Sequence, residues 1–456
     1  MHTGTRSRGW RRAAVAVVLA GAVGLTACGR PDRRAESTSP AGGTAGTLPI
    51  EEAVRSYIRL ARQLARLDPD AVETDFAPPA DAGPGGIAPS SLVPVIEAAE
   101  ALRDAMRARP PAAGGPSTAL RWAVLRGQVD ALAIQARMAA GGRLPFDEEA
   151  RALFGIAPLP DSRPDEEQAR RALDRLLPGR GDLAARVAAF ETRVQIPRDR
   201  LPAVFAAALA ACRQRTAAHV VLPPGERFTV QYVTGQPWSA YNRYRGHYQS
   251  VIQVNTDRPV SVERVLDLAC HEGYPGHHLF HVLREEQLVR GRGWSEFAIG
   301  TLMSPQGLLE EAVANEAVDI AFPGDDRLAF ERTVLYPLAG LDGSLAARAD
   351  AVRRLTARLA PVTTDVARDY LDGVIDAAAA RRALARRGAM PDPAGMLDFI
   401  DRYRSYVVAY TAGRDLVRRF LEAHGGTADH PGRRWTLFLS LATAPRPPAD
   451  LAPTVR

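Results

Sequence analysis

The chain has 456 residues, of which 46% are hydrophobic and 24% charged, so it is long and apolar enough to bury a core. Its formal net charge is +6, and it contains no lysine, which excludes both a phosphate-binding P-loop lysine and Schiff-base catalysis. Four arginines and no acid lie within residues 1–27, so the charge without this segment is near +2. So small a charge excludes nucleic acid as an expected partner, because nucleic-acid binding requires a concentrated basic patch.

Residues 1–27 have the pattern of an export signal. A basic start precedes an apolar run at 13–23, which is too short for an ordinary membrane-spanning helix. Residues 25–28, Leu-Thr-Ala-Cys, then resemble a bacterial lipobox. We therefore predict a lipoprotein signal peptide over 1–27 and lipidation of Cys28, with an ordinary cleaved signal peptide as the alternative. The predicted location is outside the cytoplasm, lipid-anchored to the outer face of the cell membrane.

Composition divides the remaining chain into a tether and one domain. Residues 28–47 are rich in Gly, Ser, Thr, Pro and Arg and are predicted to form a flexible tether. Helical periodicity dominates from 48 to 456, which predicts a single, mostly α-helical domain. Early helices are expected near 92–108, 117–140, 147–154, 164–177 and 181–195. The first 220 residues carry no catalytic pattern and are expected to form scaffold and at most one wall of a cleft.

Between 219 and 255 the pattern changes to short β-branched and aromatic runs separated by Pro and Gly, which predicts a small β-sheet. The run 250–255 is the candidate for an edge strand that pairs with an extended substrate, and a structural hairpin is the alternative. Four aromatic residues near this run are expected to line a pocket or to cap the core: Trp238, Tyr241, Tyr244 and Tyr248.

Four of the nine histidines fall within residues 270–281, Cys-His-Glu-Gly-Tyr-Pro-Gly-His-His-Leu-Phe-His. Imidazoles and a carboxylate at this density are typical of a hydrolytic zinc site that keeps one position open for water. The usual motif, His-Glu-x-x-His, places its histidines one helical turn apart, but Pro275 occupies that position here. On an unbroken helix the next imidazoles would lie about 10 Å from His271. We therefore predict a kink or bulge at Pro275 that returns His277, or alternatively His278, to the ion.

Two further cysteines follow Cys28 in the sequence. Cys212 and Cys270 both lie in apolar stretches with helical character. An exported chain can pair such cysteines in a disulfide bond. We nevertheless expect two buried free thiols, because burial alone accounts for both residues.

The histidine-rich stretch resembles the motif of a known family. Residues 271–278, His-Glu-Gly-Tyr-Pro-Gly-His-His, are similar to the signature of the bacterial domain-of-unknown-function family 885, and the stretches 238–244, 252–257 and 408–414 are also similar. The resemblance implies a mostly α, zincin-like (gluzincin-type) metallohydrolase with a small β-sheet beside the metal helix. It does not imply a particular substrate.

The resemblance also implies a third metal ligand on a later helix, a Glu in a Glu-Gly-x-Ala pattern. In the stretch 307–321, Glu311 followed by Ala-Val-Ala fits this pattern best, which makes Glu311 the expected ligand. The adjacent Glu310 is the alternative. Glu316 and Asp319 are expected to orient the ligating histidines.

Three tyrosines recur at helical spacing late in the chain, at Tyr403, Tyr406 and Tyr410. Such a stripe belongs either to the core or to the site. Gluzincins use a Tyr or His from a late helix to stabilise the oxyanion, and the resemblance favours Tyr410 for this role. Arg404 or Arg414 is expected to bind a carboxylate of the substrate.

Together these patterns predict a zinc-dependent hydrolase, a peptidase whose substrate is a peptide. His271, His277 and Glu311 are expected to hold the zinc ion. Glu272 is expected to act as general base, with Tyr410 stabilising the oxyanion. Two alternatives stay open: a lipoprotein that binds peptides or a metal in a degenerate cleft without turnover, and a purely structural envelope protein.

Overall fold

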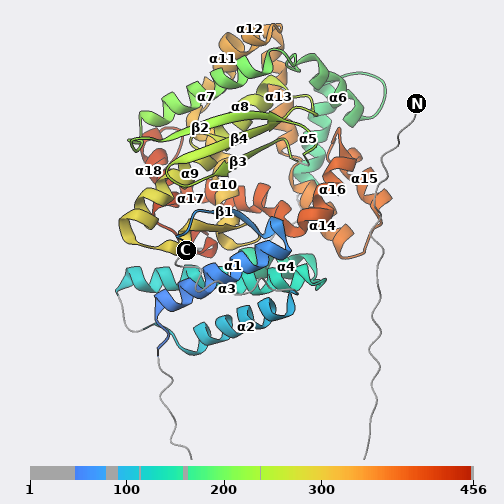
Figure 1. Cartoon of the computed structure of the whole chain (residues 1–456). Helices are drawn as coiled ribbons and strands as arrows, with labels where there is room; N and C mark the ends of the chain where they lie inside the picture. Colours follow the sequence, from blue (N-terminus) through green and yellow to red (C-terminus); the bar gives the residue numbers. More distant parts are fainter. Residues whose placement is uncertain (1–46, 79–90, 112–114, 158–162, 237, 453–456) are drawn as a thin grey trace, which may run out of the picture. The chain divides into compact units, whose positions relative to one another are not determined.

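The computed structural model describes residues 47–78, 91–111, 115–157, 163–236 and 238–452 (Figure 1). The predicted signal peptide, the lipidation site at Cys28 and the predicted tether up to residue 46 lie outside these ranges. Residues Ala45–Arg456 form one compact unit. Within the described ranges, no helix combines the length and the apolar character needed to span a membrane.

The first part of this unit is helical, as predicted. Its helices are α1 (Ile50–Leu67), α2 (Val93–Ala108), α3 (Pro116–Ala139), α4 (Phe146–Phe154), α5 (Arg163–Leu176), α6 (Leu183–Arg193) and α7 (Leu201–Ala217). Helix α1 is amphipathic and buries one stripe that includes Val54, Tyr57 and Ile58. This stripe belongs to a hydrophobic cluster that includes residues of α2 and α3. The three helices lie near one another in Figure 1.

Two small sheets complete the mostly helical architecture. The larger contains β2 (Arg227–Val233), β3 (Ala240–Tyr244) and β4 (Gln249–Asn255) in the order β2-β4-β3, with β2 parallel and β3 antiparallel to β4. The smaller is an antiparallel pair of β1 (Val72–Asp75) and β5 (Ile299–Thr301).

The prediction that residues 250–255 form an edge strand is wrong. They belong to β4, which is the central strand, and its Ile252 and Val254 are buried in the main core. Alternating β-branched residues indicate that a strand is half buried, but they do not show how many neighbours it has. The edges are β2 and β3 instead.

The second half of the unit is helical again. Its helices are α8 (Val262–Glu272), α9 (His277–Arg284), α10 (Pro305–Ala321), α11 (Asp326–Phe330), α12 (Tyr336–Ala339), α13 (Ala346–Ala357), α14 (Pro361–Leu371), α15 (Ala377–Arg386), α16 (Pro393–Tyr403), α17 (Ala412–Ala423) and α18 (Pro431–Thr443). A π-helix, η3 (Glu285–Arg290), continues α9, and a 3-10 helix, η7 (Arg404–Tyr410), follows α16. Helices α7, α8 and α10 pack together in the largest core cluster.

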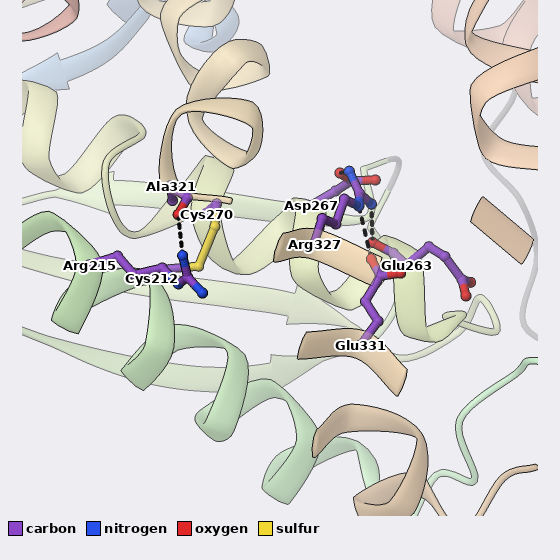
Figure 2. The surroundings of a disulfide bond; sticks show 8 residues. All are labelled: Cys212, Arg215, Glu263, Asp267, Cys270, Ala321, Arg327 and Glu331. Atoms are coloured by element: carbon purple, nitrogen blue, oxygen red, sulfur yellow. Dashed lines mark hydrogen bonds and ion pairs between the residues drawn. A yellow bond between two sulfur atoms is a disulfide. The ribbon is translucent and has the colours of Figure 1, made fainter. Parts of the chain in front are cut away.

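A disulfide bond joins Cys212 on α7 to Cys270 on α8 (Figure 2). The expectation of two free thiols is therefore wrong. Both residues are fully buried, and their Cα atoms lie 5.6 Å apart, a separation that a disulfide spans. The pairing depends on the packing of α7 against α8, which local sequence patterns do not show.

Helix α8 has a second anchor in Arg327 on α11 (Figure 2). This buried guanidinium donates to Asp267 of α8 at 2.8 Å and to Glu331 at 2.8 Å. It also donates to the backbone carbonyl of Glu263 at 3.1 Å. Charge-assisted hydrogen bonds of this kind fix the orientation of the helix that carries the histidine-rich motif.

We expect the double replacement Cys212→Ala and Cys270→Ala to lower the free energy of unfolding by about 2–4 kcal/mol, because the bond closes a long loop in the unfolded chain. The two cysteines lie 58 residues apart in the sequence. Denaturant titration with and without a reductant measures the effect. Reductant should bring the wild type to the stability of the double variant and leave that variant unchanged, and a reductant-insensitive wild type would contradict the prediction.

Candidate functional site

The histidine-rich motif spans a break between two helices. Helix α8 ends at Glu272 and α9 begins at His277. Between them, a Cβ at Gly276 would lie 1.9 Å from the carbonyl oxygen of His271, so the backbone folds over the end of α8 in a way that only glycine allows. The interruption predicted at Pro275 is present, as a complete break rather than a kink within one helix.

His271, His277 and Glu311 converge across this break. His271 Nε2 lies 3.5 Å from Glu311 Oε1, and His277 Nε2 lies 3.4 Å from Glu311 Oε2. The ligand atoms of all three residues lie within 4.8 Å of one another. Two ligands bound tetrahedrally at about 2.0–2.2 Å from one zinc ion are roughly 3.4 Å apart, so this donor set fits such an ion. Among the described residues, no other group of three or more His, Cys, Asp or Glu has this geometry.

His278, the alternative ligand, is turned away from this group into the core. Its side chain is fully buried, with Nε2 2.7 Å from a carboxylate oxygen of Glu226 and Nδ1 2.7 Å from Ser250 Oγ. Both ring nitrogens therefore already have partners. The structure brings His277, and not His278, together with His271.

The two adjacent glutamates of helix α10 also point in different directions. Glu311 faces the histidines, whereas Glu310 pairs with the buried Arg284. One turn beyond Glu311, Asn315 donates its side-chain amide to Glu311 Oε1 at 2.9 Å and to the Glu311 carbonyl at 2.8 Å. Sequence reasoning missed this supporting role of Asn315, although the i, i+4 spacing was a signal for it.

Two expectations about neighbouring charges are wrong. Glu316 and Asp319 do not orient the histidines, because they accept hydrogen bonds from Arg414 at 2.8 and 2.7 Å. Arg404 donates to the fully buried Glu149 at 2.8 Å. Both arginines predicted to bind a substrate carboxylate are thus engaged in structural ion pairs. Their partners come from distant segments or other helices, which the local sequence does not reveal.

Glu272 lies at the end of α8 beside the three converging groups. It is buried, it lines the cleft described below, and its backbone carbonyl accepts a hydrogen bond from the side chain of Asn242 on β3 at 2.7 Å. Burial raises the pKa of the Glu272 carboxyl to about 7, although the charge of His277 acts in the opposite direction. A carboxyl with a pKa near neutrality is suited to exchange protons with water.

The three converging groups shift one another's pKa values. Burial lowers the pKa of His271 to about 4. Burial also acts to lower the pKa of His277, but the hydrogen bond and charge of Glu311 outweigh it and raise that pKa to about 9. Burial acts to raise the pKa of Glu311, yet both histidines and Asn315 lower it to about 2. These shifts pair an ionised Glu311 carboxylate with a protonated His277 imidazole. A metal ion bound by His277 would displace the imidazole proton.

A cleft of about 520 Å³ opens over these residues, and tyrosines form part of its wall. Tyr403, Tyr406 and Tyr410 all line it, but not from one continuous helix as predicted. Helix α16 ends at Tyr403, Arg404 has a φ of +49°, and η7 carries the other two. Tyr406 Oη lies 3.5 Å from Glu311 Oε2, while Tyr410 is 39% exposed and packs edge-on against Tyr406.

Another part of the wall comes from β3 and the segment before it. Trp238 and Tyr241 stack on each other and line the cleft. Tyr244 points away and donates to the buried Glu285 at 2.6 Å, and Tyr248 bonds the neighbouring Glu286. The expectation of an aromatic pocket therefore holds for two of the four residues, because side chains alternate between the faces of a strand.

The wall also includes β1, in the part of the chain that the sequence predicted to form scaffold and at most one wall of a cleft. Glu73 of β1 lines the cleft together with His277 and Glu272. Burial raises the pKa of Glu73 to about 8, against the charge of His277. A single acid in a short strand has no distinctive spacing, so no sequence signal pointed to it.

No family model and no curated protein matches the chain. The solved structures that match the chain include two at low sequence identity. A candidate lipoprotein from Colwellia psychrerythraea has 15% sequence identity and a TM-score of 0.47, over 78% of this chain and 65% of that one. The M32 carboxypeptidase from Deinococcus radiodurans R1 has 14% identity and a TM-score of 0.44, over 86% of this chain and 90% of that one. The chain thus spans 65% of the length of the Colwellia protein.

Proposed function

We propose that the chain is a zinc-dependent hydrolase that cleaves peptide bonds. The observation that carries this proposal is the approach of two imidazoles and a carboxylate at 3.4–3.5 Å in a cleft, directly beside a buried glutamate. His271, His277 and Glu311 would hold the ion, and three protein ligands leave one position open, as in catalytic zinc sites. When bound, the zinc ion acts as a Lewis acid and lowers the pKa of water toward 7.

Glu272 is proposed to take a proton from the attacking water and to pass it to the leaving amine. Its burial, its place in the cleft and the anchoring of its backbone by Asn242 support this role. Tyr410 is proposed to donate a hydrogen bond to the developing oxyanion, because it faces the cleft. Tyr406, which lies closer to Glu311, is the alternative donor.

A peptide is the proposed substrate because an edge strand borders the cleft. Strand β3 pairs with β4 on one side, and its residues 240–243 line the cleft. An extended peptide can add to such an edge through backbone hydrogen bonds. We therefore propose β3, and not residues 250–255, as the strand that pairs with an extended substrate.

The remaining proposals concern family and location. The motif at 271–278 supports a place in family 885 and a zincin-like fold of the gluzincin type. The sequence of residues 1–28 supports export and attachment to the outer face of the cell membrane through a lipid on Cys28. A peptide- or metal-binding lipoprotein without turnover is the alternative function, since it would use the same three ligands.

Metal analysis combined with a peptide library tests the proposed function. We expect the purified protein to contain about one zinc ion per chain, to cleave members of the library, and to lose cleavage on treatment with a chelator. Added zinc should restore cleavage. Bound zinc without cleavage of any peptide would favour the non-catalytic alternative. Protein that binds no metal and melts at the same temperature with or without zinc would favour a structural role.

A further inference from the structure

The cleft contains one carboxyl group, that of Glu73, which has neither a role in the proposed reaction nor a partner among the described residues. Glu73 lies on β1, which is held by its pairing with β5. Its carboxyl has no hydrogen bond or ion pair with any other residue in the described part of the chain, although it lines the cleft beside His277 and Glu272. Burial favours the neutral form of Glu73, whose pKa is raised to about 8, and a bound cation would return the carboxyl to its charged form. A partly buried acid without a partner among the described residues therefore points to a cationic ligand.

The other acids near the cleft differ from Glu73 because each has an assigned partner or role. Asp70 accepts two hydrogen bonds from Arg402 at 2.9 Å. Glu311 has the histidines and Asn315, and Glu272 lies at the reacting centre. Among the described acids that line the cleft, Glu73 is therefore the one without a partner or an assigned role.

The surroundings of Glu73 suit a small cation that carries hydrogen-bond donors. The Tyr241 hydroxyl donates to the backbone carbonyl of Glu73 at 3.4 Å, which ties β1 to the wall formed by β3. Tyr241 stacks with Trp238, with ring centroids 5.6 Å apart, and both rings border the cleft. Aromatic faces attract cations, and an ammonium group offers three donors to a carboxylate.

We propose that Glu73 binds the free α-amino group of the peptide substrate, so that the enzyme removes residues from the N-terminus of a chain. This inference rests on the proposed function and specifies its substrate class. An amine held by Glu73, in the same cleft as His277 and Glu272, places the first peptide bonds of the substrate near the reacting groups. An internal segment of a peptide has no charge to offer, so Glu73 disfavours it.

The first experiment compares a short alanine peptide amide with its N-acetylated form on the zinc-loaded protein. We expect kcat/KM to be about 10- to 100-fold higher for the free amine, because hydrogen bonds to charged groups contribute on this scale. Glu73→Gln keeps the size of the side chain and removes its charge. The variant should lower kcat/KM for the free-amine peptide to the value found for the acetylated peptide. The kcat/KM for the acetylated peptide should stay the same as in the wild type.

Asp70→Asn is the matched control, because it removes a cleft carboxylate that is already paired, and it should keep the preference for the free amine. An acetylated peptide with an internal lysine distinguishes the α-amine from a basic side chain. The proposal requires this peptide to be cleaved as poorly as the other acetylated one. The melting temperature of Glu73→Gln should equal or exceed that of the wild type, since an unpaired acid is lost.

Binding to the metal-free protein, measured by calorimetry, separates this inference from the proposed function. We expect the free-amine peptide to bind at least about 10-fold more tightly than the acetylated one, with the difference lost in Glu73→Gln. Equal binding or equal cleavage of the two peptides overturns the inference, as does an unchanged preference in Glu73→Gln. Absence of cleavage of either peptide refutes the proposed reaction, and calorimetry alone then decides the role of Glu73.

Discussion

Glu272→Gln is expected to keep its zinc and to lose peptide hydrolysis by about 10²–10⁴-fold, the usual contribution of a general base. The amide has the size of the carboxyl, so it can occupy the same buried position at the end of α8. The Asn242 hydrogen bond goes to the backbone carbonyl of residue 272 and is kept in the variant. What the variant lacks is a group that accepts a proton near neutral pH.

The measurement is kcat for a cleaved peptide together with zinc content, both compared with the wild type. Asp70→Asn serves as the control, because Asp70 lines the same cleft but is engaged by Arg402, and its kcat should change little. If the Glu272→Gln variant binds zinc and keeps an unchanged kcat, Glu272 is not the general base and another residue has that role. Loss of zinc together with activity would show that residue 272 acts through the metal ligands instead.

The helices and the break in the motif were predictable because their signals are local. Pro275 and Gly276 lie four and five positions after His271. The rise of an α-helix alone shows that His277 cannot share an ion with His271 without a break. The choice between His277 and His278 stayed open in the sequence. In the structure Glu226 and Ser250 hold His278 in the core, and His277 is the imidazole that lies close to His271.

The features that sequence reasoning missed depend on contacts between distant segments. Glu73 reaches the cleft because β1 pairs with β5. The disulfide requires α7 to pack against α8. Arg404 donates a hydrogen bond to Glu149, which lies 255 positions away in the sequence. An arginine near a conspicuous motif is equally consistent with a substrate contact and with a structural ion pair until its neighbours are known.

The adjacent histidines offer a matched pair of variants with opposite expected effects. His277→Ala should abolish stoichiometric zinc binding, because a ligand is lost, while the metal-free fold keeps a stability close to that of the wild type. His278→Ala should keep zinc binding in the folded protein. It should lower the free energy of unfolding by about 2–4 kcal/mol, since it leaves a cavity and removes a partner from the buried Glu226 and Ser250.

Denaturant unfolding of the metal-free variants and zinc titration of the folded ones separate the two effects. The contrast is informative because the residues are neighbours in sequence and identical in type, so any general effect of losing an imidazole from the start of α9 appears in both. Zinc binding that survives in His277→Ala and disappears in His278→Ala would contradict the proposed ligand set. Loss of zinc in both variants, with an unchanged fold in both, would mean that the Glu226–His278 contact positions His277, which lies beside it at the start of α9.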